Sequence, residues 1–139
     1  MRGCLEVRAG GPAVGVDSML SGVWYWLVIG AFAMHGVGMI GAAGYLPFDK
    51  KGGFIGTSWL LGSGGLATAI GVIVWAAAGI AYVAAAYGLW RDLDWWQSLA
   101  LAGAIATLLA IALWFGKVPG GVYVGGALAV ATIVLVVLV

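Results

Sequence analysis

The feature that most constrains the fold of this chain is the position of its charges. All eleven formally charged side chains lie within the first 20 residues or in three short polar segments, and the four stretches between them carry none. A helix needs about 20 mainly apolar residues to cross a bilayer, and each of these stretches is close to that length. We therefore predict an all-α integral membrane protein, a four-helix transmembrane bundle with spans at about 23–46, 64–89, 97–115 and 122–139.

The composition supports this prediction and excludes other classes of protein. Hydrophobic residues make up 64% of the chain and charged residues 8%, whereas a soluble domain carries roughly 25% charged residues. So few charges cannot coat a water-facing surface, and a net charge of +1 provides no basic face for nucleic acid. We expect a multi-pass protein of the cell membrane. Its expected partners are the lipid bilayer and either other membrane subunits or further copies of itself, with no nucleic acid.

The chain divides into a leader and a single membrane domain. Residues 1–20 are mixed in polarity and glycine-rich. They lack the continuous apolar core of a signal peptide, and we expect them to be disordered or peripheral. Residues 21–139 form the predicted four-helix domain. Within it, the segment from Phe48 to Ser63 begins polar and ends apolar, so we expect either a short interfacial helix or an early extension of the second span.

Aromatic and basic residues place the spans in the membrane. Tryptophan and tyrosine cluster at nearly every predicted boundary, as their amphipathic rings do at the headgroup level. Four spans put both termini on one side. The opposite side holds Lys50, Lys51 and Lys117 close to the membrane, against Arg91 and two distant arginines of the leader on the terminal side. The nearer charges favour the loops between spans 1 and 2 and between spans 3 and 4 in the cytoplasm, whereas counting the leader gives three basic residues on each side.

The candidate site is a polar layer in the middle of the membrane. His35 is the one ionisable group within the predicted spans, and it lies near the centre of the first. At 1.5 Å per residue, Trp75, Thr107 and Thr132 fall near the midpoints of the other three spans. Met39 follows His35 by one turn on the same face. We predict that these five residues bind a ligand, because a buried imidazole without a partner costs several kcal/mol.

Several roles remain open for His35. It can be hydrogen-bonded to a neighbouring helix and only fix the packing, with Thr107 or Thr132 as acceptor, although threonines in helices also return their hydroxyls to their own backbone. It can bind a ligand or transfer a proton. With Met39 and a third ligand it could hold a soft copper ion. A single histidine and a single cysteine exclude a Cys/His zinc cluster within the chain, and we predict no resident metal site and no catalytic residue.

Two patterns of small residues add to this reading. Ala31-x-x-x-His35 puts a small residue one turn before the histidine, and it resembles the pattern with which antenna polypeptides of photosynthetic bacteria ligate bacteriochlorophyll. This likeness implies a pigment or haem with His35 as axial ligand. Separately, spacings of small residues by four are typical of close helix contacts in membranes, and we expect such contacts inside the bundle at Gly121-x-x-x-Gly125, at Gly38-x-x-x-Ala42 and at the neighbouring Gly41 and Gly44.

Residues 28–139 also resemble a wider group of proteins. The histidine–glycine pair at His35, the turn RDLDWW and the turn WFGKVPGG are similar to those of small four-span bacterial membrane proteins of uncharacterised families. The resemblance implies the four-span topology and no activity. Those proteins often carry a second histidine one turn after the first, where this chain has Met39, and this departure puts a shared histidine-pair chemistry in doubt.

These observations favour a non-enzymatic membrane protein, either an accessory subunit of a larger complex or a binder of an apolar small molecule. The alternatives are a small intramembrane enzyme with His35 as acid and base for a lipid-soluble substrate, and a pigment- or haem-binding subunit. A proton-driven pump is disfavoured because the spans contain no Asp, Glu, Lys or Arg. The sequence identifies no cofactor.

Overall fold

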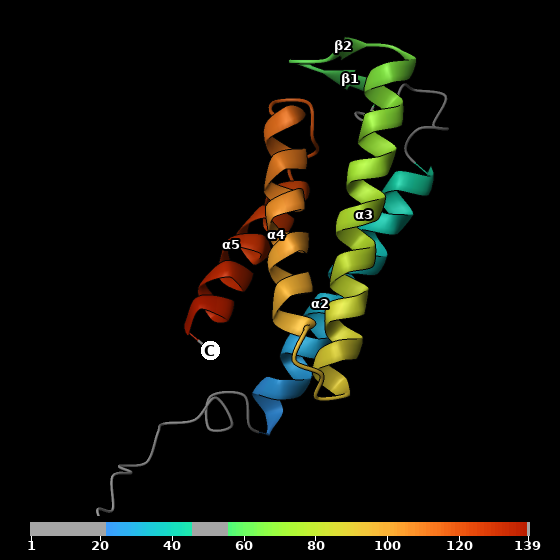
Figure 1. The fold of residues 1–139 in the computed structure, drawn as a ribbon. Coiled ribbons are helices and arrows are strands. Elements are labelled where there is room, and N and C mark those ends of the chain that lie inside the picture. The colour runs from blue at the N-terminus through green and yellow to red at the C-terminus, as the bar shows by residue number, and fades with distance from the viewer. Residues whose placement is uncertain (1–21, 46–55, 139) are drawn as a thin grey trace, which may run out of the picture.

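The chain forms a bundle of apolar helices with a small hairpin at one end (Figure 1). The structure, a computed structural model, describes residues 22–45 and 56–138. Its elements are α2 (Val23–Tyr45), β1 (Thr57–Ser58), β2 (Gly62–Ser63), α3 (Gly65–Trp90), α4 (Trp96–Leu113) and α5 (Val122–Leu138). The predicted leader, the lysines at 50 and 51 and the proline at 47 lie outside the described residues.

The four described helices begin within a residue of the predicted starts of the spans. The third span is predicted to end at about residue 115, and α4 ends two residues earlier, at Leu113. Beyond it the backbone turns, with Lys117 N–H bonded to Trp114 O at 2.9 Å and Gly116 at a φ of +73°, a left-handed conformation that favours glycine. Among the described helices, α2, α3 and α4 are long and apolar enough to cross a membrane, whereas α5 is shorter, with 17 residues.

Each helix packs on its neighbour in the sequence. Helix α2 contacts α3, α3 contacts α4, and α4 contacts α5. Successive helices run in opposite directions, so the start of α2 and the end of α5 lie at one end of the bundle and the hairpin lies at the other (Figure 1). The first and last of these helices, α2 and α5, face each other across the side of the bundle where no large helix interface closes it. The candidate site lies between these two helices.

The tightest helix contact joins α2 and α3 at two glycines. A Cβ added to Gly36 would lie 2.6 Å from the carbonyl oxygen of Gly79, and one added to Gly79 would lie 2.6 Å from that of Gly36. The backbones therefore touch directly, as small residues allow in membranes. The expected contact is wrong for Gly38, Gly41 and Gly44, because a Cβ added to any of them would meet nothing within 4 Å. Ala42, in contrast, packs against the hydrophobic core. The contact with α3 runs instead through Gly36 and Ile40, which both lie against Gly79.

The hairpin stabilises the end of α4. Residues 56–63 form neither an interfacial helix nor an extension of the second span, because β1 pairs with β2 in antiparallel register. Gly62, the first residue of β2 after the turn, has a φ of +74°. Ser58 Oγ donates a hydrogen bond to Leu113 O, and Trp59 Nε1 donates one to Ala112 O at 2.6 Å. The last carbonyls of a helix have no partner within it. Ser58 supplies a donor to the carbonyl of Leu113, and Trp59 adds a second kind of donor to the carbonyl of Ala112, which also accepts from the backbone N–H of Phe115.

Candidate functional site

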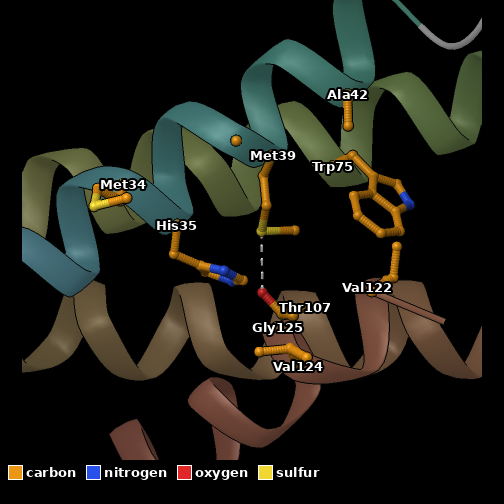
Figure 2. Close-up of a pocket in the computed structure, with 11 residues that line it drawn as sticks. Met34, His35, Met39, Ala42, Trp75, Thr107, Val122, Val124 and Gly125 are labelled. Carbon is orange, nitrogen blue, oxygen red and sulfur yellow. Dashed lines mark hydrogen bonds between the residues drawn. The ribbon is translucent and has the colours of Figure 1, made fainter. Parts of the chain in front are cut away.

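A cavity of about 310 Å³ lies between α2 and α5 (Figure 2). Helix α2 forms one wall and the first turn of α5 forms the other, and the floor consists of Met39 of α2 with Trp75 of α3 and Thr107 of α4. The lining residues are Met34, His35, Gly38, Met39, Ala42, Trp75, Thr107, Gly121, Val122, Val124 and Gly125. The lining residues include no Asp, Glu, Lys or Arg, and with His35 neutral the lining carries no formal charge.

The floor of the cavity is buried and its rim is exposed. Met39 is 3% exposed, Trp75 4% and Thr107 2%, whereas Met34 and Val124 at the rim are 79% and 72% exposed. Met34 lies near the middle of α2 and Val124 in the first turn of α5, and both side chains are exposed large hydrophobic residues. The cavity therefore opens sideways, through the surface that apolar side chains cover.

Thr107 is the best-defined polar group on the floor. Its Oγ1 lies 2.9 Å from Gly103 O, one turn back in α4, and 3.4 Å from Met39 Sδ on α2. Figure 2 shows the hydroxyl oxygen and the thioether pointing toward one another, with the His35 side chain beside them. A hydroxyl has one hydrogen and two lone pairs. Because the hydrogen is directed to these acceptors, the oxygen can offer a ligand only its lone pairs.

His35 lies in the wall between the two helices. Its imidazole meets the Tyr82 ring edge-on, with ring centroids 4.7 Å apart and planes at 89°. A Cβ added to Gly125 would lie 2.7 Å from His35 Cε1, so the glycine makes room for the ring against α5. Nε2 is buried and has no hydrogen-bond partner among the described residues. Packing against an aromatic ring and a glycine, rather than a hydrogen bond, thus holds the imidazole.

The structure brings four of the five predicted site residues together and leaves Thr132 apart. His35, Met39, Trp75 and Thr107 all line the cavity. Thr132 donates to Leu128 O at 2.9 Å and accepts from the Tyr82 hydroxyl at 3.3 Å.

Thr132 instead lines a second, smaller cavity of about 120 Å³ between α2 and α5. The depth arithmetic assumed that all four helix midpoints lie at one level. The short α5 places its first turn, rather than its midpoint, beside the cavity floor.

Sequence reasoning missed two groups of site residues. One comprises the start of α5 (Gly121, Val122 and Val124) together with Met34, which carry no polar signal. The other is Tyr82, which packs on His35 from two turns beyond Trp75 on the same helix. A phenol in the middle of an uncharged span was visible in the sequence and could have identified Tyr82.

The arrangement places a few polar groups in an apolar cavity. In the described part of the chain, no group of three or more His, Cys, Asp or Glu side chains is placed to hold a metal ion. Met39 Sδ already accepts from Thr107. Axial ligation of a tetrapyrrole through Nε2 does not fit either, because that nitrogen is buried against protein atoms. Comparisons with protein families, curated proteins and solved structures found no match to this chain.

Proposed function

We propose that this chain is an integral membrane protein that binds an apolar small molecule in the cavity between α2 and α5. The molecule enters from the lipid phase, through the exposed rim. A second reading, an accessory subunit of a larger complex, is compatible with the same site, because a partner helix would cover the same open side.

The four helices are proposed to span the membrane as one bundle. Support comes from three helices of sufficient length and apolarity and from the absence of Asp, Glu, Lys and Arg in all four. Helix α5 has 17 residues, about 26 Å at 1.5 Å per residue, against a hydrocarbon core of about 30 Å. It meets the lower limit for a span. We further propose that the turn carrying Lys117 faces the cytoplasm and the turn carrying Asp94 faces outward.

The observation that carries the binding function is the lateral cavity with a polar floor. Small-molecule sites are mostly apolar clefts of roughly 300–1,000 Å³ with a few placed polar groups. The cavity, at about 310 Å³, is at the small end of that range, and Thr107 and His35 supply the polar groups. The Thr107 hydroxyl already donates its hydrogen inside the protein. The support for a ligand site is that its oxygen, which lines the cavity, keeps lone pairs that can accept a further hydrogen bond.

Binding is favoured over catalysis by the surroundings of His35. A histidine that acts as general acid and base is usually oriented by a hydrogen bond to its second nitrogen. Nε2 of His35 has no such partner among the described residues, and no carboxylate, cysteine or lysine lines the cavity.

The test uses two glycine-to-leucine variants of α2. Gly38 lines the cavity and Gly41 does not, and a Cβ at either position meets nothing within 4 Å. Both changes also replace a poor helix former by a good one. We expect Gly38→Leu to fill the mouth of the cavity and Gly41→Leu to leave it open. The full-length protein is purified in mild detergent, and its bound molecules are identified by native mass spectrometry and solvent extraction.

The proposal holds if wild type and Gly41→Leu retain the same small molecule and Gly38→Leu loses it. Equal content in all three proteins, or none in any, contradicts it. A polypeptide that co-purifies with every variant would instead support the accessory subunit, and a coloured preparation would restore the pigment alternative.

A further inference from the structure

The side chains that line the cavity restrict the charge of a ligand that can bind there. Its eleven lining residues include no Lys, Arg, Asp or Glu. With His35 neutral, a charged head group entering this site would lose its hydration without gaining a counter-ion, which is strongly unfavourable. The occupant of the cavity is therefore neutral.

The hydrogen bonds of Thr107 indicate whether the ligand must donate or accept a hydrogen bond. One hydrogen serves either Gly103 O at 2.9 Å or Met39 Sδ at 3.4 Å. The carbonyl is the stronger acceptor, because thioether sulfur accepts only weakly. In either case the hydroxyl hydrogen is engaged inside the protein, and the oxygen retains lone-pair capacity. A ligand that contacts Thr107 must then supply the hydrogen.

We infer that the cavity selects a neutral lipophilic molecule with a hydrogen-bond donor, such as an alcohol or phenol, and that Thr107 is the residue that distinguishes it from a molecule of the same shape without a donor. This inference rests on the proposed binding function and adds the chemical class of the ligand. The Thr107 oxygen accepts from the ligand hydroxyl, Met39 and Trp75 form the apolar floor around the ring or chain, and the tail leaves through the rim between Met34 and Val124.

The chain offers a matched control for Thr107. Thr132 is equally buried, at 2% exposed, and its hydroxyl also donates to the carbonyl one turn back at 2.9 Å. It lies outside the cavity. Replacing either threonine by valine removes one buried hydroxyl from one helix at similar shape. Only the change at residue 107 removes an acceptor from the cavity.

The experiment measures the binding of three probes of similar shape, 4-octylphenol, 4-octylanisole and 4-octylbenzoate, to the full-length protein in lipid nanodiscs. Calorimetry gives the affinities, and Gly38→Leu protein in the same nanodiscs corrects for partition into lipid. We expect wild type to bind the phenol about 5- to 10-fold more tightly than its methyl ether, as one hydrogen bond allows, and to bind the benzoate most weakly. Thr107→Val should bring the phenol-to-ether ratio close to one, whereas Thr107→Ser and Thr132→Val should keep it.

The outcomes separate this inference from the proposed function. Equal binding of phenol and ether by wild type, blocked by Gly38→Leu, leaves the binding function intact and overturns the donor selection. A ratio that survives Thr107→Val overturns the role of Thr107, and preferred binding of the benzoate overturns the selection for a neutral ligand. If no probe binds wild type above the Gly38→Leu background, the binding function itself fails. Thr107→Ser keeps the hydroxyl, so its ratio shows whether a loss in Thr107→Val reflects the acceptor or the fold.

Discussion

The contact of α2 with α3 at Gly36 and Gly79 allows a quantitative prediction. In Gly36→Ala, the new Cβ would lie 2.6 Å from the Gly79 carbonyl oxygen. Ordinary contact begins at 3.4 Å, so the two backbones must separate locally by about 0.8 Å. A gap of this size removes roughly a quarter to a half of the dispersion energy of the atoms it separates. The obstacle is the backbone of a facing helix, which cannot rotate away as a side chain can.

We expect the clash in Gly36→Ala to cost about 1–3 kcal/mol, as overpacking usually does. Because alanine favours helix more than glycine does, a gain of roughly 1 kcal/mol opposes this cost, so that the net loss in the free energy of unfolding is about 0–2 kcal/mol. The control is Gly41→Ala in the same helix, where the added Cβ meets nothing within 4 Å. It receives the gain without the clash and should be as stable as wild type or more stable.

The measurement is equilibrium unfolding of the purified protein in mixed detergent micelles, with increasing SDS as denaturant and helical circular dichroism as the signal. The prediction is that Gly36→Ala has a lower free energy of unfolding than Gly41→Ala. If Gly36→Ala is as stable as Gly41→Ala, the backbones of α2 and α3 do not touch at this level, and the packing derived from it is wrong.

Two further predictions concern the hairpin and the orientation. Ser58→Ala removes the donor to Leu113 O and should cost about 1 kcal/mol. It should also speed amide exchange in the last turn of α4, measured by hydrogen–deuterium exchange; unchanged exchange there would mean that the hairpin does not hold this end. For the orientation, Lys117→Cys and Asp94→Cys are made in a Cys4→Ser background. An impermeant maleimide applied to intact cells should label the cysteine at 94 and spare the one at 117, and the reverse pattern would invert the proposed topology.

The limits of the helices could be predicted from the sequence because several independent signals coincide there. At the turn between α3 and α4, Arg91 and two aspartates interrupt the apolar run and tryptophans flank it. The level of Trp75 and Thr107 could also be predicted, because α2, α3 and α4 are antiparallel neighbours. Counting residues from their ends therefore finds side chains at similar depth.

The sequence could not show which way each helix faces. These helices are apolar on all sides, so no amphipathic stripe identifies the face that is buried. Gly36 and Gly38 are two residues apart in a run of small residues, yet one touches α3 and the other lines the cavity. Thr132 was misplaced for a related reason, since its depth depends on how the short α5 sits against its neighbours. The buried face of each helix and the depth of α5 both depend on tertiary packing, which the local sequence pattern does not determine.

The order in which the helices pack also has a consequence for biosynthesis. Each large interface joins helices that follow one another in the chain, so it can form as soon as the second of the two has left the ribosome. The wall made by the first turn of α5 is the exception, because it faces α2 across the whole intervening sequence. The cavity therefore comes into existence only with the final helix, and a chain stopped before α5 would have the Gly36–Gly79 contact but no enclosed site.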